Sequence, residues 1–199
     1  MHPVHRLALP ALAFALAACA SAQTPAPSRP LEARDYFPLH REAAWSFDSE
    51  DVGAPGTTGL VVMRVVRDDG AGGFYVQQGN HGAPALYDFR EGSLTRNGET
   101  ILSNPIAAGT RWEGSSHDGY VIRNVGLTRT VPAGTFHDVI EVVRTAAEAT
   151  LVNGTEYRET FFYAPRVGPI EAMVPVMMPS NEVRRFHLVL RGYTLDGQF

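Results

Sequence analysis

The feature that most constrains the fold is a series of short β-rich segments, separated by turn-forming residues at intervals of about ten residues. One such segment is LVVMRVV (60–66), followed by the turn sequence RDDGAGG and then by FYVQQG (74–79). Asn-Gly pairs at 97–98 and 153–154 are typical of two-residue hairpin turns. No segment has a convincing 3.6-residue period. The pattern predicts an all-β protein built as an antiparallel meander, with at most one short helical turn within residues 31–44.

The stretch VPAGTFHDVIEVV (131–143) marks a corner of this meander. Pro132 lacks the N–H that a strand ladder needs, and Gly134 can take a positive φ, so the two favour a turn between strands. Thr135 has no base nearby and is not read as a nucleophile. We expect further strands over 44–48, 85–91, 99–103, 120–125, 126–131, 138–149, 156–164, 170–176 and 182–195.

The amino terminus has the form of a secretion signal. Arg6 is the one firm positive charge before the apolar stretch LALPALAFALAAC, which is too short for a stable transmembrane helix. Its last four residues, LAAC, resemble the bacterial lipobox, in which the chain is cut before the cysteine and lipid is attached to it. We therefore predict a signal peptide over residues 1–18 and lipid attachment at Cys19. The alternative is an ordinary signal cut after Ala20 or Ala22, with Cys19 discarded.

The rest of the chain is predicted to be a tether and one domain. Residues 19–34 are rich in Pro, Ala and Ser, as in a semi-rigid linker. Residues 35–199 then form a single β domain, in a chain of 199 residues that is 44% hydrophobic and 19% charged. Ala20 follows the cysteine where an aspartate would suggest inner-membrane retention, so we expect anchoring in the cell envelope, at the outer membrane if the host has one.

Composition excludes several functions. All seventeen Lys+Arg residues are Arg, which rules out chemistry that needs a lysine amine. The net charge of −4 argues against a nucleic-acid partner. Cys19 is the only cysteine, so the mature domain has no disulfide and no thiol nucleophile. Nothing in the sequence implies a cofactor.

The segments VPAGTFHDVIEV and TFFYAPRVGPIEA, with YFPL…W and ILSNPIAAGTRW upstream, resemble a pattern of uncharacterised bacterial envelope lipoproteins (PAGTF-x-DV … YAP-x-VG). The likeness covers most of residues 36–193. It implies a curved sheet or incomplete barrel similar to the LolA/LolB-like half-barrels, in which a sheet shelters an acyl chain. It brings no catalytic residue with it. Arg166 stands where the family has glycine, which leaves the turn type there open.

The His and Asp residues offer an alternative function. His117-Asp118 and His137-Asp138 would support a hydrolase or a metal-assisted enzyme if they converged across strands. The histidines, however, lack the H-x-x-x-H or H-x-H spacing of a metal site, so we predict no metal. The run GSSHDG (114–119) is read as a polar loop, since a catalytic triad is assembled in space and not from adjacent residues.

Two groups of residues are candidates for ligand contact. The first is a flexible apolar lip formed by Met173, Met177 and Met178, whose alternative is a hairpin that closes one end of the core. The second is a polar-lined cavity inside the curved sheet. Its candidate residues are Arg185, His187, Arg191, Glu159 and Glu141, for which ordinary cross-strand pairs on a solvated face are the alternative.

These observations favour a non-enzymatic binding or interaction module, attached to a membrane through Cys19. Its expected partners are an apolar small molecule or another envelope protein. A continuous apolar cavity would support the first, and a completely filled core the second.

Overall fold

The computed structural model describes residues 29–79, 82–114, 117–146 and 157–195. Within these residues the chain forms one short 3-10 helix, η1 (Ala33–Tyr36), and twelve strands. The strands are β1 (Ala44–Asp51), β2 (Thr58–Asp68), β3 (Phe74–Gln78), β4 (Ala85–Arg90), β5 (Ser93–Arg96), β6 (Glu99–Leu102), β7 (Arg111–Glu113), β8 (Gly119–Val131), β9 (Gly134–Thr145), β10 (Arg158–Ala164), β11 (Gly168–Met177) and β12 (Val183–Thr194).

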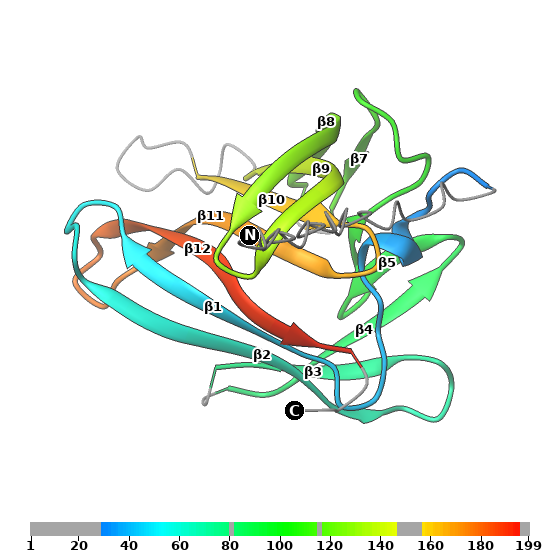
Figure 1. Ribbon diagram of the computed structural model, residues 1–199, viewed down its shortest axis with the longest axis horizontal. Coiled ribbons are helices and arrows are strands. Elements are labelled where there is room, and N and C mark those ends of the chain that lie inside the picture. Colours follow the sequence, from blue (N-terminus) through cyan, green and yellow to red (C-terminus); the bar gives the residue numbers. More distant parts are fainter. Residues whose placement is uncertain (1–28, 80–81, 115–116, 147–156, 196–199) are drawn as a thin grey trace, which may run out of the picture.

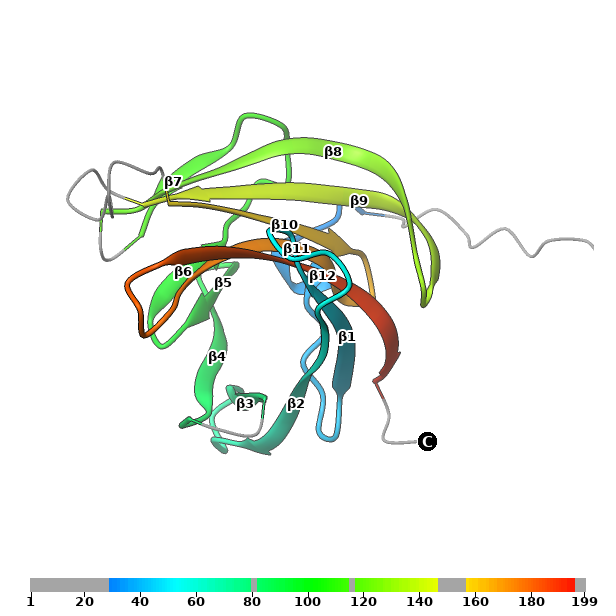
Figure 2. The same cartoon turned by 90° about the vertical axis from the view of Figure 1, so that its left-hand side faces the viewer.

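The strands form a single antiparallel sheet whose order is β6-β5-β4-β3-β2-β1-β12-β11-β10-β9-β8-β7. The two halves of the chain are both meanders, and they join where β1 pairs with β12. The sheet curls into a nearly closed barrel, so that β3 to β5 lie opposite β10 to β12 (Figures 1 and 2). One seam stays unsealed, between β6 and β7. The predicted all-β antiparallel meander and incomplete barrel are therefore confirmed.

Alternation along the strands sets the inner face of the barrel. In β1, Trp45 and Phe47 are buried while Ser46 between them is half-buried. In β12, Leu188 and Leu190 are buried while Arg191 is exposed. Successive side chains of a strand point to opposite faces, so one face of each strand supplies the core.

The corner at Pro132 is the two-residue turn of the long β8–β9 hairpin, as predicted. Val131 pairs with Gly134, whose φ of 140° favours glycine. The two predicted strands over 120–131 are one strand, which is bent by three register shifts in its pairing with β9. The bend brings the hairpin tip over the sheet, where the Ala133 N–H donates to the Leu190 carbonyl at 2.9 Å.

The turn between β10 and β11 packs on Trp45. The Trp45 indole N–H donates to the Val167 carbonyl at 2.6 Å, and a Cβ on Gly168 would lie 3.1 Å from Trp45 Nε1. Gly168 has a φ of 105°. Arg166 has a φ of 62°, so it takes the left-handed conformation that glycine would favour at this place.

Residues before 35 also belong to the folded domain. Ala33 is fully buried, and its N–H donates to Asn104 Oδ1 at 2.9 Å. The Arg29 guanidinium binds the Asp35 carboxylate, with Nη2 2.8 Å from Oδ1. The end of the predicted tether (19–34) is therefore packed against the sheet, because η1 offers apolar side chains that the tether composition did not reveal.

Candidate functional site

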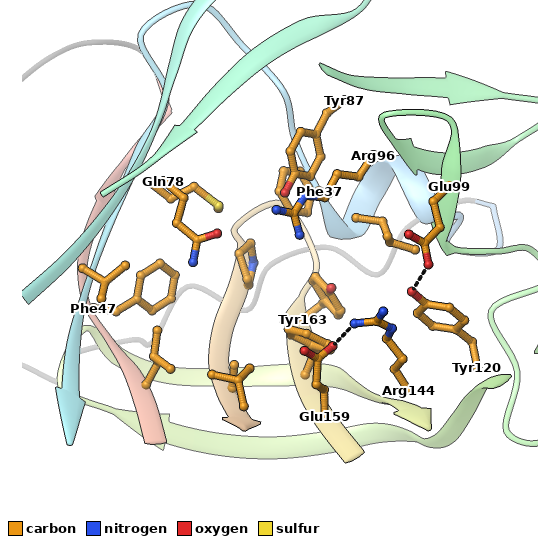
Figure 3. Close-up of a pocket in the computed structure, with 18 residues that line it drawn as sticks. Phe37, Phe47, Gln78, Tyr87, Arg96, Glu99, Tyr120, Arg144, Glu159 and Tyr163 are labelled. Carbon is orange, nitrogen blue, oxygen red and sulfur yellow. Dashed lines mark hydrogen bonds and ion pairs between the residues drawn. The ribbon is translucent and has the colours of Figure 1, made fainter. Parts of the chain in front are cut away.

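A cavity of about 220 Å³ lies inside the curved sheet (Figure 3). Its walls come from both halves of the chain, so the closure of the sheet creates it. Most of its lining is apolar or aromatic. The lining residues are Phe37, Phe47, Val61, Met63, Gln78, Tyr87, Arg96, Glu99, Ile101, Tyr120, Arg144, Glu159, Phe161, Tyr163, Pro169, Ala172, Val174 and Leu188.

The apolar part of the wall follows from strand alternation. Val61 and Met63 are two residues apart in β2, and Ala172 and Val174 are two residues apart in β11, so each pair points to one face. Ala172 stands opposite Leu188 of β12 in the register. Branched and aliphatic side chains from three strands therefore meet in one apolar surface.

Arg144 forms the best-satisfied polar group in the wall. Its Nη1 donates to Glu159 Oε2 at 2.8 Å, and its Nε donates to Asp118 Oδ2 at 3.0 Å. The Asp118 side chain is only 3% exposed. Burial lowers the pKa of Arg144, but the hydrogen bond and charge of Glu159 outweigh it and raise the pKa above its ordinary value. Because both carboxylates hold this guanidinium, the group ties β9 and β10 to the residue preceding β8.

A second polar group spans the seam between β6 and β7. The Tyr120 hydroxyl donates to Glu99 Oε1 at 2.7 Å, and the Trp112 indole N–H donates to the Thr100 carbonyl at 2.9 Å. The rings of Trp112 and Tyr120 stack with centroids 5.3 Å apart. Burial, and then the Glu99 carboxylate, raise the pKa of Tyr120 well above its ordinary value. Side chains thus bridge the two edge strands that share no backbone ladder in the described residues.

The remaining polar side chains of the wall have no hydrogen-bond or ion-pair partner in the part of the chain that the structure describes. They are Gln78, Tyr87, Arg96 and Tyr163. A second, more open hollow of about 420 Å³ shares Val61, Gln78, Tyr87 and Arg96 with the cavity. The unpartnered groups Gln78, Tyr87 and Arg96 therefore lie where the two spaces meet.

The predicted methionine lip does not line this cavity. Met173 alternates with Ala172 and Val174, so it faces away from the interior. Met177 is exposed at the end of β11, and Met178 follows in the turn to β12. Both flanking segments are paired strands, as the alternative interpretation required.

Of the residues predicted to line a polar cavity, those on the charged face of β12 point away from the cavity described above. His187 Nε2 lies 2.9 Å from Glu171 Oε1, and Arg191 is exposed with its Nη1 3.3 Å from Asp48 Oδ1. Arg185 is also exposed. Of the five candidates, only Glu159 lines the cavity.

Glu141 is buried, but it binds side chains of β8 and does not line the cavity. Its Oε1 and Oε2 accept hydrogen bonds from Arg123 at 3.2 Å and Asn124 at 2.6 Å. Both donors lie on β8, next to β9 in the sheet, so Glu141 does not face the arginines of β12.

The two His-Asp pairs do not converge. His117 and Asp118 precede β8 at the end where Gly119 pairs with Thr145, whereas His137 and Asp138 lie near the hairpin tip, where Arg129 pairs with Phe136. Asp138 and Thr145 are seven positions apart in β9, roughly 23 Å along the strand. His117 Nδ1 lies 2.5 Å from Glu113 Oε1 and His137 Nδ1 lies 3.1 Å from Thr128 Oγ1. No group of three potential metal ligands occurs among the described residues.

The predicted lipid-attachment residue, Cys19, lies outside the described residues. Within them, no helix has the length and apolar character needed to cross a bilayer.

No protein-family model matches the chain, and no curated protein matches it. Two solved structures are similar to it over 80% of its length and 98% of theirs. One is a "putative lipoprotein" from Parabacteroides distasonis, with 14% identity and a TM-score of 0.39. The other is a "putative exported protein" with a YmcC-like fold from Bacteroides fragilis, with 11% identity and a TM-score of 0.41. The relation to LolA/LolB-like half-barrels stays a prediction.

Proposed function

We propose that this protein is a lipid-anchored envelope protein whose barrel-like sheet binds a small, largely apolar ligand. The observation that carries the proposal is the cavity of about 220 Å³, lined mainly by apolar and aromatic side chains. An engineered apolar cavity of about 150 Å³ suffices to bind benzene. A space of this kind, with a few polar groups at one side, is the usual form of a small-molecule site.

The anchor rests on the sequence LAAC, which ends at Cys19. Attached acyl chains contribute about 0.8 kcal/mol for each buried methylene, so a lipidated protein stays with the membrane. We expect the wild-type protein in the membrane fraction of its host and a Cys19→Ala variant in the soluble fraction. An unchanged distribution of the variant would contradict lipidation at this residue.

A non-enzymatic role fits the wall chemistry better than the hydrolase alternative. The Arg144 guanidinium is held by two carboxylates, and the Tyr120 hydroxyl is bound to Glu99. The His-Asp pairs that would support catalysis lie apart along the β8–β9 hairpin. No described nucleophile in the cavity wall stands beside a histidine base.

Calorimetric titration of 1-octanol into the full chain carrying Cys19→Ala tests the binding proposal. The expected result is saturable binding to one site. Ala172→Phe places a large side chain in the cavity, so it should weaken binding at least about tenfold. Val176→Phe is the matched control, since Val176 lies on the same strand but is 39% exposed. It should bind octanol as the parent does.

Thermal unfolding of both phenylalanine variants shows whether they fold. Loss of binding in a folded Ala172→Phe variant, with binding retained in Val176→Phe, supports the cavity as the site. Absence of saturable binding in the parent, or equal binding in both variants, would overturn the proposal.

A further inference from the structure

Three residues of the cavity wall form a row across neighbouring strands. Tyr87 of β4 pairs with Arg96 of β5, and Arg96 pairs with Glu99 of β6. Directly opposed residues of an antiparallel pair have Cβ atoms roughly 5 Å apart and share a face. All three line the cavity, and Figure 3 shows Tyr87 and Arg96 directed toward the same part of it.

Tyr163 joins this row from the opposite wall. Phe37 lies between the two tyrosines, with its ring centroid 5.3 Å from that of Tyr87 and 6.3 Å from that of Tyr163. Tyr87 is 6% exposed and Tyr163 is 4% exposed. Neither hydroxyl has a hydrogen-bond partner in the described chain. No fully buried side-chain nitrogen or oxygen of the described residues lacks a partner, so both hydroxyls open onto the cavity, where they are free to donate to a bound group.

Arg96 is an exposed cation at the edge of the cavity, and no carboxylate of the described residues pairs with it. Glu159 is bound by Arg144 and Glu99 by Tyr120, so each carboxylate already has a donor. Arg96 lines the same cavity and, among the described residues, forms no ion pair, not even with its cross-strand neighbour Glu99. Its guanidinium presents donors in a planar fork that matches a carboxylate. The carboxylates of Glu99 and Glu159 repel a negatively charged ligand group. Such a group therefore binds Arg96 most favourably on the side that faces Tyr87.

The volume of the cavity and the position of the open hollow beside it limit the size and orientation of the apolar part of the ligand. The apolar wall formed by Val61, Ala172, Val174 and Leu188 takes a hydrocarbon chain. By proportion with benzene in a cavity of about 150 Å³, a space of about 220 Å³ holds roughly eight or nine non-hydrogen atoms. The more open hollow shares Arg96 and Tyr87, so the polar end of the ligand lies at the mouth.

We propose that the cavity selects a medium-chain carboxylate, whose head group binds Arg96 and the Tyr87 and Tyr163 hydroxyls while its chain lies in the apolar interior. This inference rests on the proposed binding function and names the ligand class. A carboxylate accepts from all three donors, whereas an alcohol satisfies them in part and an ammonium group has no acceptor to offer them.

Three probes with the same chain test the head-group preference: octanoate, 1-octanol and octylammonium. Each is titrated calorimetrically into the full chain carrying Cys19→Ala at neutral pH. We expect octanoate to bind at least about tenfold more tightly than octanol, as for a charge-assisted contact, and octylammonium to bind most weakly.

Two pairs of variants assign the preference to residues. Arg96→Ala should abolish the advantage of octanoate over octanol, because only the carboxylate gains a charge-assisted contact from the guanidinium. Arg64→Ala is the matched control, because Arg64 is an exposed arginine of β2 between inward-facing Met63 and Val65. Tyr87→Phe should reduce octanoate affinity severalfold, and Tyr75→Phe, at a ring outside the cavity lining, should not.

The outcomes separate this inference from the function on which it rests. The carboxylate assignment is supported if the parent and Arg64→Ala bind octanoate more tightly than octanol and a folded Arg96→Ala does not. If the parent binds octanol as tightly as octanoate or more tightly, the carboxylate assignment is overturned, and so it is if octylammonium binds most tightly. In both cases the apolar cavity remains a binding site. Failure of all three probes overturns both.

Discussion

At the scale of single residues, Gly168 is the position most constrained by its surroundings. It combines a φ of 105° with a Trp45 indole that a Cβ would approach to 3.1 Å. We predict that Gly168→Ala lowers the free energy of unfolding by about 2 kcal/mol or more, because backbone strain and a clash in the core add. Urea unfolding measures the change.

Gly126→Ala separates the two causes. Gly126 has a φ of 68°, but nothing lies within 4 Å of the place its Cβ would take. This variant should show backbone strain alone and a loss smaller than that of Gly168→Ala. Equal losses in the two variants would contradict the role given to the Trp45 contact.

Individual site residues were the hardest to predict from the sequence. Arg96 precedes the Asn97-Gly98 turn, and nothing in its neighbours distinguishes it from the other arginines. Its significance comes from Tyr163, which is far away in the chain and reaches the same cavity only when the sheet closes. Glu159 lines the cavity, where it binds Arg144 instead of the arginines of β12.

At the scale of elements, the seam between β6 and β7 depends on side chains. Trp112→Phe keeps a ring that can stack on Tyr120 but loses the hydrogen bond to the Thr100 carbonyl. We predict a loss of about 1 kcal/mol in unfolding free energy and faster hydrogen exchange of the β6 amides. Trp112→Ala also loses the stacking and should cost more.

Hydrogen exchange followed by NMR or mass spectrometry gives the local readout for these variants. If β6 amides exchanged at the parent rate in both, the indole contact would not hold the seam.

The strands themselves were largely predictable, because turn residues and alternation are local signals. The Asn97-Gly98 turn is confirmed, with φ of 51° and 84° at its two residues. β5 (Ser93–Arg96) and β7 (Arg111–Glu113) were missed, since segments this short carry too few residues for a pattern. The direction of the β12 charged face was misjudged for another reason: alternation separates two faces without saying which one is inside.

At the scale of the whole molecule, the pairing of β1 with β12 joins the two halves of the chain, and the curl of the sheet brings them around one interior. The apolar wall, the satisfied Arg144 group and the unpartnered Tyr87 and Arg96 all arise from that closure. The resemblance predicted a curved sheet, and this was confirmed. The volume and lining of the interior follow from contacts distant in sequence, which no local pattern predicts.

Native mass spectrometry of the Cys19→Ala protein, isolated gently from its own host, tests the central claim most directly. The account predicts a reproducible extra mass that corresponds to a small amphiphile, and its absence from Ala172→Phe prepared in the same way. A bare polypeptide mass for the parent, or the same extra mass on both proteins, would contradict the claim that this cavity binds the ligand.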